Sequence, residues 1–126
     1  MKIKDSDSAL DYAATMCDTL PIESGKQRIY AVITDKQGRI LSEAANDYES
    51  SCSVQRMYAK ASGLGDKVFN HAECLALQRL GRSRSRAYRI TVVRLLKNGE
   101  MALSAPCRVC RKAIKDFGIK SVEYSI

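Results

Sequence analysis

The stretch His71-Ala72-Glu73-Cys74 and, 36 residues after the histidine, the stretch Pro106-Cys107-Arg108-Val109-Cys110 decide how this 126-residue chain folds. His71 is its only histidine. Each stretch follows a loop or a strand-like segment and opens an apolar pattern at helical spacing. Both stretches are therefore predicted at helix N-termini, and we expect the two N-termini to meet at one edge of a sheet.

Helices and strands are expected to alternate around these two stretches. Helices are predicted over residues 6–20, 54–61, 71–80 and 106–117. Strands are predicted over residues 29–34, 39–44, 88–96 and 119–126, with 100–104 as a short extended segment after the Asn98-Gly99 turn. This order predicts an α/β sandwich with a mixed sheet.

The composition is that of an ordinary globular protein, with 45% hydrophobic and 28% charged residues. The length suits one domain over residues 1–126. No apolar run approaches the ~20 residues that a membrane span needs, so no membrane association is expected. Residues 1–5 show no signal-peptide pattern, and five cysteines is an odd number. We therefore expect a reduced, cytoplasmic protein.

The net charge of +7 is concentrated in one third of the chain. Residues 1–81 hold 10 basic and 11 acidic side chains, whereas residues 82–126 hold 11 basic and 3 acidic ones. The excess begins with the run Arg82, Arg84, Arg86 and Arg89. Such a surface attracts phosphate, on a nucleotide or on single-stranded nucleic acid. A solvated basic face without a ligand is the alternative.

The two motifs supply the side chains of a catalytic zinc site. Three protein ligands with a fourth position open to water are typical of such sites, and His71, Cys107 and Cys110 are the expected three. The positive end of a helix favours the thiolates that bind metal. Glu73 is the expected proton shuttle, and the backbone amide of Ala72 could bind a carbonyl oxygen of the substrate.

Three other interpretations of the same residues remain open. Glu73 could only cap its helix, because Asn70 and Glu73 have the spacing of a capping box. The Cys-x-x-Cys pair could be a redox pair. Cys74 could join His71 and the two cysteines in a closed structural Cys₃His site, although it also belongs to an apolar helical series typical of a core.

Taken together, His71-Ala72-Glu73 and Pro106-Cys107…Cys110 match the H-x-E…P-C-x-x-C signature of zinc nucleobase deaminases. Over roughly residues 29–126 the chain resembles the cytidine deaminase-like superfamily, in particular small phage- or bacterial-type cytidine and deoxycytidylate deaminases. The resemblance implies a three-layer α-β-α sandwich. It also implies that Asn46 contacts the sugar or base of the substrate; the alternative for Asn46 is a turn residue.

This chain departs from the family at its C-terminal end. Family members commonly have a fifth strand, and here a four-stranded sheet is expected, which leaves an edge that a partner subunit could cover. A homo-oligomer is therefore expected.

The leading hypothesis is a Zn²⁺-dependent hydrolase that converts cytosine to uracil in a free nucleoside or nucleotide such as cytidine, deoxycytidine or dCMP, with release of ammonia. The first alternative is a deaminase of single-stranded DNA or RNA, favoured by the basic C-terminal third. The second is a non-catalytic nucleic-acid- or protein-binding module with structural zinc.

Overall fold

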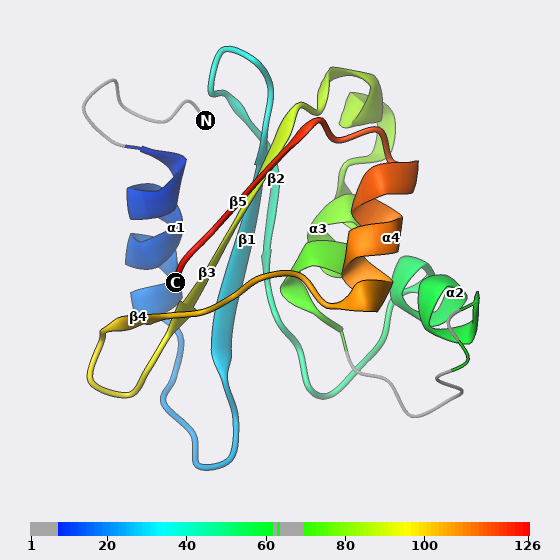
Figure 1. Ribbon diagram of the computed structural model, residues 1–126. Coiled ribbons are helices and arrows are strands. Elements are labelled where there is room, and N and C mark those ends of the chain that lie inside the picture. Colours follow the sequence, from blue (N-terminus) through cyan, green and yellow to red (C-terminus); the bar gives the residue numbers. More distant parts are fainter. Residues whose placement is uncertain (1–7, 62, 64–69) are drawn as a thin grey trace.

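A mixed sheet of five strands separates one helix from three others (Figure 1). The structure is a computed structural model that describes residues 8–61, 63 and 70–126. The helices are α1 (Ala9–Asp18), α2 (Ser53–Ala61), α3 (Ala72–Arg79) and α4 (Arg108–Asp116), with a 3₁₀ helix η1 (Gly81–Arg86). The strands are β1 (Arg28–Thr34), β2 (Ile40–Ala45), β3 (Arg89–Leu95), β4 (Met101–Ala102) and β5 (Ser121–Tyr124).

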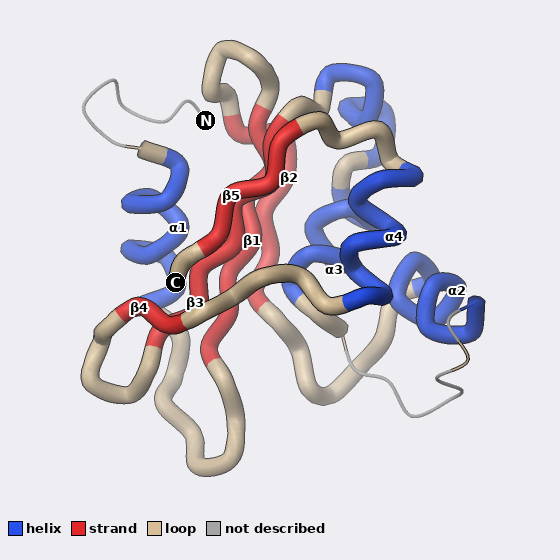
Figure 2. Tube along the Cα trace, in the orientation of Figure 1, coloured by secondary structure: helices blue, strands red, loops and turns tan. Residues whose placement is uncertain are grey.

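The predicted α/β fold with three layers is confirmed, and the predicted number of strands is wrong by one. β1 pairs antiparallel with β2 and β3, whereas β5 pairs parallel with β3. The additional strand is β4, which pairs with only Arg94 and Leu95 of β3. β1 occupies one edge of β3 along its whole length, so β4 and β5 must share the other edge (Figure 2). The sheet is thus four positions wide although it has five strands.

The two central strands carry apolar side chains on both faces. In β1, Tyr30 and Val32 belong to the cluster that packs against α1, while Ala31 and Ile33 belong to the cluster beneath the other helices. Successive side chains of a strand point to opposite faces, so a strand covered on both sides becomes a nearly continuous apolar run. This covering on both sides explains the β-branched run from which the strand is predicted.

Several predicted boundaries move by one to three residues. The first helix starts at Ala9, with the Ser8 hydroxyl accepting a bond from the backbone N–H of Asp11; residues 6 and 7 of the prediction lie outside the described residues. Pro106 was expected to open the last helix, but Cys107 is its N-cap and Arg108 its first residue. The final strand covers residues 121–124 rather than 119–126.

Helix α3 is the element through which the sheet positions the site. Its Leu77 is 1% exposed and lies in the larger core cluster. The hydroxyl of Ser42 in β2 donates a 2.6 Å hydrogen bond to the carbonyl oxygen of Ala76. Packing and this bond fix α3 against the sheet, and with it the N-terminal turn that carries His71 and Glu73.

We predict that Leu77→Ala lowers the free energy of unfolding by about 2–5 kcal/mol, the cost of emptying a buried leucine site. Urea denaturation followed by circular dichroism measures the change. Leu96→Ala is the matched control, because Leu96 is 39% exposed and its truncation should change stability by less than about 0.5 kcal/mol. Equal losses in the two variants would contradict the packing described here.

Candidate metal centre

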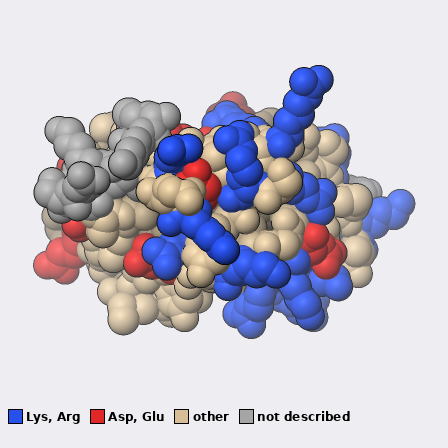
Figure 3. All heavy atoms as spheres, turned by 90° about the horizontal axis from the view of Figure 1, so that it is seen from above, with Lys and Arg blue, Asp and Glu red and all other residues tan. Residues whose placement is uncertain are grey.

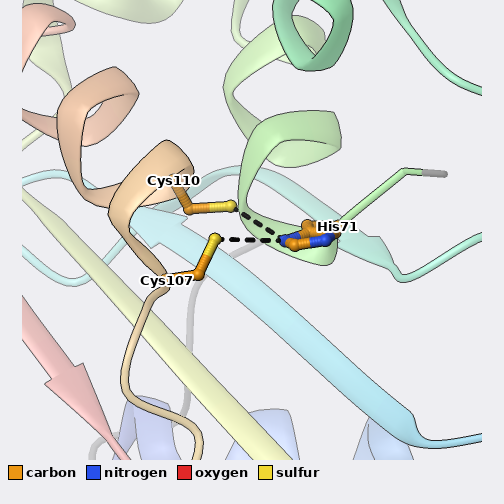
Figure 4. A group of neighbouring side chains, drawn as sticks. All are labelled: His71, Cys107 and Cys110. Carbon is orange, nitrogen blue, oxygen red and sulfur yellow. Dashed lines mark hydrogen bonds between the residues drawn. The ribbon is translucent and has the colours of Figure 1, made fainter. Parts of the chain in front are cut away.

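The N-terminal ends of α3 and α4 face each other and bring three metal-binding side chains together (Figure 4). His71 is the N-cap of α3 and Cys107 is the N-cap of α4, both with extended backbone, and neither side chain caps its own helix. Cys110 lies in the first turn of α4. The predicted convergence of the two motifs is therefore confirmed.

The distances suit a single tetrahedral metal ion. The Nδ1 atom of His71 lies 3.5 Å from Sγ of Cys107 and 3.3 Å from Sγ of Cys110. Zinc bonds of ~2.3 Å to sulfur and ~2.1 Å to nitrogen, at tetrahedral angles, place a nitrogen and a sulfur about 3.6 Å apart. The ligand atoms of the three residues all lie within 4.8 Å of one another. The set thus fits zinc with one position left over.

One of the two thiols is held ready as a thiolate. The hydrogen bond from Cys110, with help from His71, lowers the pKa of Cys107 to about 3. The same bond is the main cause that raises the pKa of Cys110. The thiolate is the form that binds metal, and a bound cation deprotonates a coordinating thiol outright. Both residues are free cysteines, and their convergence on a histidine favours a metal site over a redox pair.

Glu73 is a buried carboxyl group beside this cluster. It is 6% exposed, and burial raises its pKa above the usual range of a glutamate. The capping-box interpretation is wrong, because the N-cap of α3 is His71 and not Asn70. Asn70 instead forms an isolated bridge with Asp47, and its side-chain oxygen accepts a 2.6 Å bond from the backbone N–H of Cys52. Glu73 is thus not the N3 partner of a capping box.

A glutamine that the sequence did not single out holds the histidine in place. The side-chain oxygen of Gln55, in α2, accepts a 2.9 Å hydrogen bond from the backbone N–H of His71. Gln55 is only 1% exposed. It lies beside Val54 in the predicted helix, and no motif or spacing distinguishes it. Its role depends on the packing of α2 against α3, which the local sequence does not encode.

The segment that leads into α4 is fixed by two buried serines. The Ser104 hydroxyl donates a 2.7 Å bond to the carbonyl oxygen of Val92 in β3, and its oxygen lies 2.9 Å from that of Ser125. Ser125 in turn donates to the carbonyl oxygen of Ala102. These bonds tie the stretch between β4 and Cys107 to the sheet, so the first cysteine has a defined position.

A cavity of about 230 Å³ opens beside the cluster. Glu73, His71 and Cys107 line it together with Asn46. Its other walls come from the start of β1, the loop after β2, β3 and the segment before α4: Gln27, Ile29, Tyr48, Arg94, Leu103, Ser104 and Ala105. A small molecule in this cavity would contact both the metal ligands and the buried carboxyl.

Asn46 and Ala72, the two predicted substrate residues, lie in different surroundings. The side chain of Asn46 lines the cavity, but its oxygen accepts a bond from the N–H of Ile29 and its nitrogen donates to the carbonyl oxygen of Gln27. Asn46 therefore joins the end of β2 to the start of β1. Ala72 is the first residue of α3 and its side chain is fully buried. A substrate contact by either residue stays a prediction.

Cys74 belongs to the core rather than to the ligand cluster. It is fully buried and packs in the larger core cluster. Its sulfur is 3.6 Å from that of Cys110, yet it is not part of the group whose ligand atoms all lie within 4.8 Å of one another. The geometry favours three protein ligands and an open fourth position over a closed Cys₃His site.

Residues 4–126 match the family described as the cytidine and deoxycytidylate deaminase zinc-binding region. The chain belongs to this family. Zinc is accordingly the cofactor of this deaminase-family protein, and His71, Cys107 and Cys110 are positioned to bind a metal ion. No curated protein matches the sequence.

Solved structures of cytidine deaminases share the fold of this deaminase-family chain. The crystal structure of cytidine deaminase from Burkholderia pseudomallei has 20% sequence identity and a TM-score of 0.58, over 97% of this chain and 83% of that one. A glutamate-to-glutamine mutant of cytidine deaminase from Mycobacterium tuberculosis has 16% identity and a TM-score of 0.54, over 89% and 77%. At these identities the likeness concerns the fold.

We predict that the purified chain holds one zinc ion and that Cys107→Ser and Cys110→Ser lose it. Removal of one of three ligands leaves too few strong bonds for tight binding. Elemental analysis by mass spectrometry after gel filtration measures the metal content. Cys74→Ala is the control and should retain one zinc ion per chain. Loss of zinc from Cys74→Ala alone, with Cys107→Ser unaffected, would contradict the assignment of the ligands.

Proposed function

We propose that this chain is a zinc-dependent hydrolase that deaminates cytosine in a free nucleoside or nucleotide, such as cytidine, deoxycytidine or dCMP. Membership of the deaminase family supports hydrolytic deamination. The observation that carries the proposal further is the position of Glu73, which lines the same cavity as His71 and Cys107. A proton-transfer group and a metal-binding group therefore meet at one small-molecule site.

In this proposal His71, Cys107 and Cys110 hold zinc and leave one coordination position for water. Zinc bound there would lower the pKa of that water toward about 7 and so supply a nucleophile at neutral pH. The fit rests on the separations of 3.3–3.5 Å between the histidine nitrogen and the two sulfurs. Gln55 keeps the histidine oriented through its backbone N–H.

Glu73 is the proposed carrier of protons. Its carboxylate takes a proton from the water that attacks C4 of cytosine and passes it to the ring nitrogen N3. A second proton then goes from the water-derived hydroxyl, by way of Glu73, to the leaving amino group, so that one water is consumed and one ammonia is released. Burial raises the pKa of Glu73, which suits a group that must both accept and donate a proton near neutral pH.

A free nucleoside or nucleotide is the substrate that the cavity favours. Its volume of about 230 Å³ lies below the ~300–1,000 Å³ typical of cavities that hold small molecules, so it suits a ligand no larger than a nucleoside or nucleotide. Asn46, Tyr48 and Gln27 border it with polar groups. We propose that the unused hydrogen-bonding capacity of the Asn46 amide contacts the sugar or the base, and that the backbone N–H of Ala72 contacts the base carbonyl.

The proposal treats residues 1–126 as one cytoplasmic deaminase domain that forms a homo-oligomer. All five cysteines are free rather than disulfide-bonded, which agrees with a reducing compartment. Val122 and Tyr124 are 43% and 41% exposed on β5, which of the described strands pairs only with β3 and so lies at an edge of the sheet. Among the described residues, no helix has the length and apolar character of a membrane span.

We predict that Glu73→Gln lowers kcat for ammonia release from cytidine or deoxycytidine by at least about 100-fold, because it removes the proton carrier. The variant should still hold one zinc ion per chain. Ammonia release in a coupled assay, with zinc content measured on the same sample, tests this. Glu49→Gln alters an exposed acid and should leave kcat unchanged. Full turnover by Glu73→Gln would remove Glu73 from the mechanism.

We also predict which substrates release ammonia. A panel of cytidine, deoxycytidine, their monophosphates, adenosine, guanine and single-stranded oligonucleotides is incubated with the zinc-loaded chain. At least one free cytosine nucleoside or nucleotide should be deaminated, and adenosine and guanine should not. Deamination of oligonucleotides alone would replace this proposal with that of a polynucleotide deaminase. No release from any member of the panel would favour a non-catalytic zinc module.

A further inference from the structure

A second cavity, of about 930 Å³, lies at the far end of α3 and α4 from the metal centre. Three segments form it: the β1–β2 turn, η1 with the residues before β3, and the residues between α4 and β5. These segments are distant in sequence and meet at the top of the molecule in Figure 1. Helix α4 begins next to Cys107 and has nine residues, so the cavity is about 13 Å from the ligand cluster at 1.5 Å per residue.

The lining of this cavity, which we call the basic pocket, is strongly positive. It contains two carboxylates and six cations: Asp35, Asp116, Lys36, Arg39, Arg82, Arg84, Arg86 and Lys120. The resulting net charge of the lining is +4. Figure 3 shows Lys and Arg side chains gathered on this face, seen from above. The arginines of the predicted basic run other than Arg89 therefore line a concave site together with two cations of the hairpin turn.

Both carboxylates of the basic pocket already have partners other than the cationic side chains of the pocket. Asp35 accepts 2.9 Å bonds from the backbone N–H groups of Gln37 and Arg39, which shapes the β1–β2 turn. Asp116 accepts a bond from the Tyr58 hydroxyl and pairs with Lys112, outside the pocket. Within the described part of the chain, none of the six cations forms an ion pair with a carboxylate.

Two of the six cations are held in fixed positions by aromatic rings. The guanidinium of Arg84 lies 4.0 Å from the centre of the Phe117 ring and donates a 2.9 Å bond to the carbonyl oxygen of Asp116. The ammonium of Lys36 lies 5.7 Å from the centre of the Tyr88 ring. Cation–π contacts restrict a charged side chain without neutralising it. Because cations cover these ring faces, the pocket suits phosphate better than a stacked base.

Stabilisation of helix ends explains only part of this charge. Cations near a helix C-terminus complement its dipole, and Arg84 does so for α4 through the Asp116 carbonyl. In contrast, the side chains of Arg39, Arg82 and Lys120 make no hydrogen bond, ion pair or ring contact with any residue that the structure describes. Like charges in a concavity repel one another, and an anion between them would relieve that repulsion.

We propose that the basic pocket binds adjacent phosphate groups, carried by a free nucleoside triphosphate or by single-stranded nucleic acid, at a site separate from the metal centre. The forked guanidinium groups of arginine donate two parallel hydrogen bonds to phosphate. Arg39 and Arg82 come from two different segments of the lining, the hairpin turn and η1, and both are exposed. This inference does not depend on deaminase activity, because no metal ligand lines the pocket.

The test measures phosphate binding by the zinc-loaded full chain and by two double variants. Arg39→Gln/Arg82→Gln removes two charges from the pocket. Lys60→Gln/Lys97→Gln is the matched control, because it removes the same charge from exposed positions elsewhere. Fluorescence anisotropy with a labelled 12-nucleotide oligo(dT) is one arm, and calorimetry with ATP and inorganic triphosphate is the other. Thermal unfolding and deamination by both variants should match the wild type.

The pocket variant should weaken binding of at least one ligand class about 10-fold more than the control does. For the oligonucleotide, the slope of log affinity against log salt concentration should also become shallower by about 1.4, or ~0.7 for each lost phosphate contact. Binding of ATP and triphosphate alone assigns a free nucleotide, and binding of oligo(dT) alone assigns a polynucleotide. Absence of binding in both arms at 50 mM salt, or equal weakening in the two variants, overturns the proposal.

Discussion

The contact between two helix N-termini, where His71 Nδ1 lies within 3.5 Å of two cysteine sulfurs, is the constraint on which the site depends. Neither helix end is capped by its own N-cap side chain. His71 and Cys107 are 36 positions apart in the sequence, and their side chains contact each other instead of capping their own helices. A metal ion bound there would connect α3 to α4, and both helices contribute to the larger core cluster.

The rest of the fold keeps these two ends in register. Asn70 and Asp47 exchange backbone bonds of 2.9 Å just before His71, and Gln55 holds the histidine backbone from α2. On the cysteine side, Ser104 and Ser125 attach the approach to α4 to the central strand β3. Asp116 of α4 and residues of η1, which follows α3, line the basic pocket, so one packed pair of helices connects the two sites.

The sequence predicts much of this arrangement because its signals are local. Local sequence patterns located the helices α1 to α4 and the strands β1, β2, β3 and β5, but not the 3₁₀ helix η1, and the two motifs identified the candidate ligand set. These patterns misplaced Asn70 as a helix cap because Asn70 and Glu73 have capping-box spacing, whereas the helix starts one residue later, with His71 as its N-cap. The role of Gln55 and the pairing of β4 were not predicted, because both depend on contacts between segments that are far apart in the sequence. The basic pocket needed the hairpin turn and η1 to be brought together by the sheet.

The central claim is that three protein ligands hold the metal and leave a position for water. X-ray absorption spectroscopy at the zinc edge counts sulfur and nitrogen or oxygen neighbours directly. The account predicts two sulfurs at about 2.3 Å and two lighter ligands, the His71 nitrogen and a water oxygen, at about 2.0–2.1 Å. Three sulfurs and one nitrogen, with no exchangeable oxygen, would contradict it and make the site a closed structural one with Cys74 as the fourth ligand.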